Sequence, residues 1–275
     1  MKKFGFTLVE VLMTLGIIGV VGMLVTPSLV ENCRNQANGA RLATAVSNLE
    51  NAFTTAMAAQ NAETLQETTL WHNNDYAGAG HDLRANAADT PIFYGQLGRF
   101  MNLNGFVEAQ SMSSYYPEDG NARLGQLNAN GNRGANGLPH GSNVAPDNAC
   151  HIIAAKNGTT YFVGTGDASD HTAQENNIRN SGGSLINSLA RVGIDVNGLE
   201  GPNLVGRDIF FFYLGENGIL YPVGGNDVAR FLSNGANNNN IWDSQFAQFG
   251  CRDGAIQGGF GCTARVVEEG YKINY

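Results

Sequence analysis

The stretch Phe6-Thr-Leu-Val-Glu-Val-Leu-Met-Thr-Leu-Gly-Ile-Ile-Gly-Val-Val-Gly-Met-Leu-Val25 decides the fold of this 275-residue chain. It is about 20 residues long, the length that an apolar helix needs to cross a bilayer. Two basic residues, Lys2 and Lys3, precede it, and positive charge tends to stay on the cytoplasmic side. The sequence therefore predicts one membrane-spanning helix, with the rest of the chain on the far side of the membrane.

One acidic residue, Glu10, lies inside this apolar run. An ionised carboxylate in the middle of a membrane helix costs roughly 2.5–3.5 kcal/mol, so its presence asks for a partner. An ordinary anchor fits the length of the run but leaves Glu10 unexplained. A secretory signal would end in small residues at a cleavage site, where this chain has Val25-Thr-Pro-Ser-Leu29. Neither interpretation accounts for the whole segment.

The stretch Gly5-Phe6-Thr7-Leu8-Val9-Glu10 resembles the cleavage and methylation motif of type IV prepilins and type II secretion pseudopilins. In that family, a prepilin peptidase cuts after the glycine and methylates the new N-terminal residue. The resemblance implies cleavage between Gly5 and Phe6 and N-methylation of Phe6. It also implies that the new ammonium pairs with Glu10 of a neighbouring subunit, which would fix the register between apolar helices.

The resemblance further implies how the chain is organised and where it resides. Residues 1–5 would be the leader peptide, 6–30 the transmembrane and filament-core helix, and 31–275 the periplasmic or extracellular body. The expected location is the bacterial inner membrane, followed by a periplasmic pseudopilus or a cell-surface pilus. Expected partners are prepilin peptidase, inner-membrane lipid, and other copies or related pilin subunits. Pro27 lies where helices of this family commonly bend.

Beyond Pro27 the chain becomes polar but keeps helical spacing. Apolar residues recur every three or four positions at Leu42, Val46, Leu49, Phe53 and Met57. This spacing predicts an amphipathic helix with a single stripe facing a core. The pattern resembles the second half of a pilin helix, which lies across a sheet.

Two hairpins are predicted in the second half of the chain. Asn157-Gly158 is a strong two-residue turn signal between apolar runs, and the segment 215–218 separates a second pair. The predicted strands are 151–155, 159–163, 208–214 and 219–223. We expect an α+β, pilin-like fold in which the long helix packs on a four-stranded antiparallel sheet.

Two further segments are interpreted more coarsely. Within the region from 60 to 148, the Gly- and Asn-rich stretch from 120 to 148 is predicted to be a long loop or insertion. The tail from Cys262 to Tyr275 resembles the closing segment of large pilin-like proteins, which end in a cysteine, a short strand and an aromatic-Lys dipeptide. That dipeptide would be Tyr271-Lys272.

The four cysteines form no C-x-x-C pair, so they do not indicate a zinc or redox motif. An even number in an exported protein favours disulfides. Cys251 and Cys262 are close in sequence and flanked by glycines, and we predict that they pair. Cys33 and Cys150 would then pair by elimination, unless Cys33 stays free because it follows the apolar run so closely.

The segment from Asp195 to Asp208 contains oxygen-bearing side chains on turn-forming residues. A calcium site would use Asp195, Asn197, Glu200 and Asp208, because carboxylate and amide oxygens suit this hard cation. The segment departs from an EF-hand loop, since Gly198 is at the wrong offset. The competing interpretation is an Asx-type turn that leads into the strand at Asp208.

The overall composition excludes little but points away from several functions. With 16 Lys and Arg against 24 Asp and Glu, the net charge is −8, so nucleic acid is not indicated as a partner. No hydrolase, phosphate-loop or dinucleotide motif occurs, and no cofactor other than calcium is expected. The sequence therefore predicts a structural subunit and not an enzyme. The alternative is a membrane-anchored periplasmic binding or enzymatic domain that does not polymerise.

Overall fold

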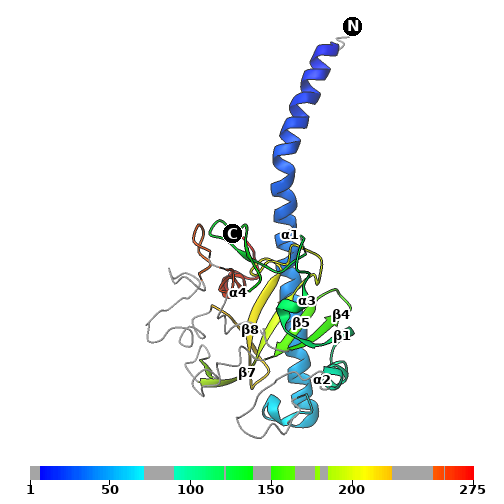
Figure 1. Cartoon of the computed structure of the whole chain (residues 1–275), viewed down its shortest axis with the longest axis vertical. Coiled ribbons are helices and arrows are strands. Elements are labelled where there is room, and N and C mark those ends of the chain that lie inside the picture. Colours follow the sequence, from blue (N-terminus) through cyan, green and yellow to red (C-terminus); the bar gives the residue numbers. More distant parts are fainter. Residues whose placement is uncertain are drawn as a thin grey trace, which may run out of the picture.

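The computed structural model describes residues 7–70, 90–120, 122–138, 150–164, 177–179, 185–224, 250–256 and 258–275. Its longest element is helix α1 (Leu8–Gln60), of 53 residues. The N-terminal half of α1 projects from the body, and the C-terminal half runs along the sheet (Figure 1). The helix continues through Pro27, and the projecting half is gently curved.

Helix α1 has a distinct cap at each end. At the N-terminus, Thr7 and Glu10 form a capping box, in which each side chain accepts a hydrogen bond from the other residue's backbone amide. At the C-terminus, Asn61 adopts a left-handed conformation with φ 52° and its amide donates to the carbonyls of Met57 and Ala58. The ends of the helix are therefore set by local chemistry at Thr7 and Asn61.

The main sheet is antiparallel and is larger than the sequence predicts. Its strands follow the order β1-β4-β5-β7-β8-β9, and the short strand β6 pairs with β7. The bounds are β1 (Leu103–Gln110), β4 (Cys150–Ala155), β5 (Thr160–Gly164), β6 (Asn177–Arg179), β7 (Leu185–Asp195), β8 (Ile209–Gly215) and β9 (Leu220–Pro222). The two predicted hairpins are present as β4–β5 and β8–β9. The prediction of four strands is wrong, because β7 lies between the hairpins and β1 extends the far edge.

The region from 60 to 148 contains regular structure, and β2 and β3 fall in the part that was predicted to be a loop or insertion, 120–148. It includes η1 (Leu65–Glu67), α2 (Thr90–Leu97), α3 (Met112–Tyr115), β2 (Gly125–Leu127) and β3 (Arg133–Asn136), besides β1. Strands β2 and β3 form a separate two-stranded antiparallel sheet.

The tail also differs from the prediction. The expected short strand after Cys262 is a helix, α4 (Cys262–Glu268). Arg265 Nε donates to Glu269 Oε1 at 3.0 Å one turn later, a pairing that helical spacing allows and a strand does not.

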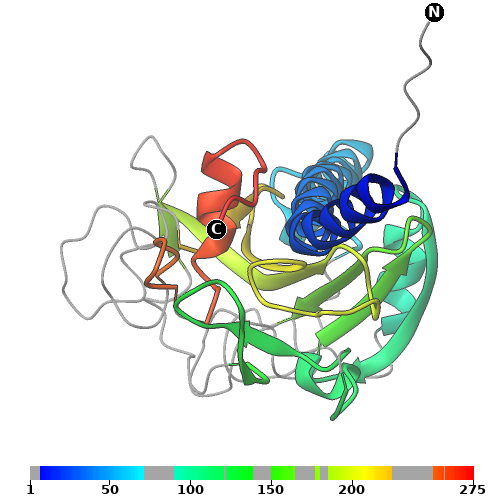
Figure 2. The ribbon, with the colours of Figure 1, turned by 90° about the horizontal axis from the view of Figure 1, so that it is seen from above.

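Both faces of the main sheet are covered. Helices α1 and α4 lie over one face, and α3 with the β2–β3 pair lies over the other (Figure 2). Phe210 and Phe212 pack in the cluster beneath α1, whereas Phe211 between them packs with Phe260 on the opposite face. This explains why β8 is an unbroken apolar run instead of an alternating one. The predicted stripe on α1 is confirmed, with Leu42, Val46, Leu49 and Phe53 buried and Met57 half-buried.

One disulfide joins the tail to the preceding loop. Cys251 and Cys262 are bonded, with a Cα–Cα distance of 4.9 Å, as predicted. The second pairing, Cys33 with Cys150, is not formed. Cys33 is exposed on α1, whereas Cys150 is buried at the start of β4 with its Sγ 3.3 Å from the Gln110 carbonyl oxygen.

Candidate functional site at the junction of α1 and the body

The projecting half of α1 exposes an apolar surface. Its large apolar side chains are exposed by 42% at Val11 and by up to 81% at Met23. Among the described residues, α1 is the one helix that is long and apolar enough to cross a membrane, a property shared by anchors and signal sequences. A continuous apolar surface of this size requires a covering that the described chain does not provide.

The N-terminal motif is only partly within the described residues. Gly5 and Phe6, the predicted cleavage residues, lie outside them. Glu10 is described, and its carboxylate accepts from both the backbone amide and the hydroxyl of Thr7, each at 2.8 Å. In this single chain, Thr7 at the start of the same helix therefore provides the hydrogen-bonding partner for Glu10.

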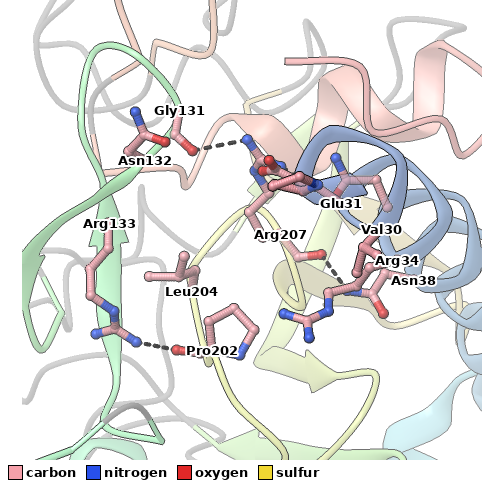
Figure 3. Close-up of a pocket in the computed structure, with 12 residues that line it drawn as sticks. Val30, Glu31, Arg34, Asn38, Gly131, Asn132, Arg133, Pro202, Leu204 and Arg207 are labelled. Atoms are coloured by element: carbon pink, nitrogen blue, oxygen red, sulfur yellow. Dashed lines mark hydrogen bonds and ion pairs between the residues drawn. The ribbon is translucent and has the colours of Figure 1, made fainter. Parts of the chain in front are cut away.

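Where α1 enters the body, a cavity of about 320 Å³ separates the helix from two loops (Figure 3). One wall comes from the side of α1 that faces the two loops, the second from the turn between β2 and β3, and the third from the loop before β8. The lining residues are Pro27, Val30, Glu31, Arg34, Asn35, Asn38, Gly131, Asn132, Arg133, Pro202, Leu204 and Arg207. Half of the lining residues therefore belong to the turns of α1 that follow the apolar run.

Arg207 connects all three walls. Its Nη1 donates to Glu31 Oε1 at 2.8 Å and to Asn35 Oδ1 at 3.2 Å, and its Nη2 donates to the Gly131 carbonyl at 2.9 Å. In return, Asn38 Nδ2 donates to the Arg207 carbonyl at 3.1 Å. The guanidinium is largely buried, and its Nε has no acceptor among the residues that the structure describes. Arg207 therefore fixes α1 to the body and leaves one donor unused.

Two more guanidinium groups border the cavity. Arg133 extends from β3, and its Nη2 donates to the carbonyls of Pro202 and Arg123. Arg34 extends from α1 toward the loop that contains Pro202 (Figure 3), and it is exposed. Three arginines against the single carboxylate of Glu31 give the lining a formal charge of +2. This contrasts with the net charge of −8 for the whole chain.

A buried acidic cluster lies behind the cavity wall. Asp208 follows Arg207, and its carboxylate accepts from the backbone amides of Asn203, at 3.0 Å, and Leu204. Asp195 accepts from the hydroxyl of Tyr116 at 2.8 Å. Burial and repulsion from Asp208 raise the pKa of Asp195 well above its usual range. Burial raises the pKa of Asp208 to about 7, an effect partly offset by its amide donors and by Arg34.

The predicted calcium residues form a turn in this structure. The Asn197 amide donates to Asp195 Oδ1 at 3.1 Å, the bond of an Asx turn, and Gly198 follows with φ 62°. Asp195 and Asp208 come close enough to repel each other, whereas the Glu200 side chain is exposed. Across the described residues, no three His, Cys, Asp or Glu side chains gather around one point. Calcium at these four residues stays a prediction.

The arginine cavity was missed by the sequence reasoning. Asp208 was noted as the end of a turn-forming segment, but nothing in the sequence pairs its neighbour Arg207 with Glu31, 176 positions earlier. Arg34, the first basic residue after the apolar run, was the signal that could have drawn attention to the junction. A comparison with known proteins found no matching family model, no matching curated protein and no matching solved structure.

Proposed function

We propose that this chain is a type IV pilin-like subunit, either of a type IV pilus or of a type II secretion pseudopilus, that polymerises through α1. The observation that carries the proposal is the contrast along that helix. Its first half is apolar and exposed, and its second half is buried on the sheet. Such a helix needs lipid before assembly and the helices of other subunits afterwards.

The prepilin-like motif lies at the start of the exposed half of α1. Cleavage there would remove the leader and leave this half at the new N-terminus. In the proposal, the precursor lies in the bacterial inner membrane with its N-terminus in the cytoplasm and its body in the periplasm. Prepilin peptidase cuts between Gly5 and Phe6, and Phe6 is methylated. The helix then leaves the lipid for the core of a filament, where van der Waals packing provides the cohesion.

Glu10 has two roles to separate. In the filament, its carboxylate is proposed to pair with the Phe6 ammonium of a neighbouring subunit and so to fix the axial register. In the single chain, the same carboxylate completes the capping box with Thr7. A glutamine also completes a capping box but carries no charge. Glu10→Gln therefore removes the pairing and keeps the cap, whereas Glu10→Ala removes both.

The test compares these two variants in the bacterium that makes the protein. We expect both to be inserted and processed, and both to give a strongly reduced yield of filaments, measured by immunoblot of sheared or fractionated fibres. A normal yield from Glu10→Gln beside a reduced yield from Glu10→Ala would assign Glu10 to the cap alone. A normal yield from both would remove the register role altogether.

A membrane-anchored periplasmic binding or enzymatic domain is the second candidate. The observation that favours it is the capping box, because Glu10 then needs no neighbouring subunit. Such a protein would keep its N-terminal Met-Lys-Lys, since no prepilin peptidase would act on it. The mass of its N-terminus therefore separates the two candidates.

A further inference from the structure

The loop that contains Arg207 lies between α1 and the disulfide loop, residues 250–256 and 258–262. On one side, Arg207 donates to Glu31 and Asn35 of α1. On the other side, a Cβ at Gly206 would lie 3.0 Å from the Cβ of Cys262, so the chain passes close to the disulfide there. A movement of Cys262 would therefore reach Arg207 across a single residue.

Close packing joins the same two loops at further points. Leu204 lies in one buried cluster with both cysteines of the disulfide. A Cβ at Gly259 would lie 2.0 Å from the carbonyl oxygen of Val205, so only glycine permits the two backbones to approach so closely. Because the disulfide fixes both ends of its loop, the bond also holds this contact surface in place.

Tyr275 provides a second connection between the two loops. Its ring centroid is 5.0 Å from the guanidinium carbon of Arg265 and 5.6 Å from that of Arg207, both within the range of cation–π attraction. Its hydroxyl donates to the carbonyl of Gly206. Arg265 is anchored to the disulfide loop in turn, because its Nη1 donates to the Cys251 carbonyl at 2.7 Å. Tyr275 therefore contacts a group on each side.

The contacts of Arg207 differ in kind from those that hold α1 further along. From Leu42 to Phe53, α1 packs on the sheet through apolar side chains. At Asn35 and Asn38 it exchanges hydrogen bonds with Arg207. Hydrogen bonds weaken steeply when their distance or angle changes. A small displacement of the Arg207 loop would thus loosen α1 at the junction and leave its apolar stripe docked.

We propose that the Cys251–Cys262 disulfide controls how firmly α1 is held at the junction, as a redox-sensitive device that acts once, during folding. Forming the bond oxidises two thiols, and their two electrons and two protons pass to a disulfide of an exchange partner, which leaves as a dithiol. The inference rests on the proposed function for an exported location, where such partners occur. Both cysteines are fully buried once they are joined. A chain without the bond would present its body at a variable angle to α1.

Hydrogen exchange of the full-length chain in detergent, followed by mass spectrometry, tests the proposal. The readout is the exchange rate of residues 31–38 divided by that of residues 42–56, because a global loss of stability raises both rates alike. Cys251→Ala combined with Cys262→Ala removes the bond. We expect the ratio to rise about fivefold, the effect of weakening one buried polar contact. Arg207→Gln removes the contact directly and should give a similar rise.

Two further variants serve as control and as second test. Ile152→Ala is the control, because Ile152 is buried on β4, three strands away from β8 in the sheet. It should lower the stability of the body and leave the ratio unchanged. Tyr275→Leu keeps the disulfide and removes the ring and the hydroxyl, so we expect an intermediate ratio. It provides the test if the chain without the two cysteines does not fold, and a wild-type ratio would then overturn the proposal.

The decisive comparison removes the disulfide in the Arg207→Gln background. If the bond acts through Arg207, its removal there should raise the ratio no further. A further rise of the same size, an unchanged ratio in the cysteine variant alone, or an equal rise in Ile152→Ala would overturn the proposal. The measurement needs neither leader removal nor filaments, so its failure and the failure of the proposed function are separate outcomes.

Discussion

The two halves of α1 are one continuous helix in two environments. In the half from Leu8 to Val30, every large apolar side chain is exposed. In the half from Asn35 to Ala56, one face is buried against the sheet, with Leu42, Leu49 and Phe53 fully covered. The body therefore supplies an apolar environment for one half and none for the other.

The two halves of α1 therefore depend on different apolar environments. Burying a single large apolar side chain contributes about 1.5–3 kcal/mol, so each half depends strongly on what covers it. The second half is part of the core of the body. In the proposed function, the first half joins a second core, formed with lipid or with other subunits. Variants that act on one half and not the other are the direct way to examine this division.

The largest effect is expected from Phe53→Ala. Phe53 is fully buried between α1 and the sheet, so its loss leaves a cavity and lowers the free energy of unfolding of the body by about 3–5 kcal/mol. Leu15→Ala is the matched change in the projecting half, and we expect it to leave the body's unfolding unchanged. Guanidinium unfolding of the detergent-solubilised chain, followed by near-ultraviolet circular dichroism, measures both. Similar losses from the two variants would refute the division into separate cores.

The pH dependence of stability should also belong to the body half. The folded pKa of Asp208 is raised to about 7, so the folded state holds this proton more tightly than the unfolded chain does. Stability should therefore fall as pH rises from about 4 to about 7, by on the order of 1 kcal/mol per pH unit, and this contribution should be constant above pH 7. Asp208→Asn should reduce that slope, with Asp195 accounting for what remains, and Glu10→Gln should leave it as it is. Thermal unfolding of the three proteins between pH 4 and 8 provides the measurement; an unchanged slope in Asp208→Asn would contradict the assignment.

A smaller effect is expected near the start of the buried half of α1. A Cβ at Gly39 would lie 2.0 Å from the carbonyl oxygen of Tyr271, a backbone atom, so either the helix or the tail must shift. We expect Gly39→Ala to lower the free energy of unfolding by about 1–3 kcal/mol despite the higher helix propensity of alanine. Gly19→Ala is the control, because nothing lies within 4 Å of its new methyl group. The same denaturation experiment applies, and a stabilised Gly39→Ala would show that the tail does not pack there.

The parts of the fold that sequence could predict are those with local signals. Asn157-Gly158 predicted the β4–β5 turn, and the spacing from Leu42 to Met57 predicted the buried face of α1. Strand β7 was missed because polar and small residues interrupt it. Arg191 stacks at 4.4 Å over the ring of Tyr213, and Gly193 leaves space for Phe211. Both contacts depend on the neighbouring strand β8, so the residues of β7 alone do not predict them.

The candidate site divides in the same way. The motif around Glu10 is contiguous, so the sequence alone indicates it, and its role stays a prediction; the cap with Thr7 was not foreseen. The arginine cavity brings together residues from α1, β3 and the loop before β8. No local pattern reports such long-range proximity. The same limit applies to Cys33 and Cys150, whose pairing rested on elimination alone and is not formed.

The most direct test of the account is the mass of the N-terminus of the protein isolated from the bacterium that makes it. If the first half of α1 is released to enter a filament core, the mature chain begins at Phe6 and carries one added methyl group. Peptide mass spectrometry of the N-terminal fragment reads both features at once. A chain that still begins Met-Lys-Lys, or one cut after the apolar run near Val25, would contradict the account.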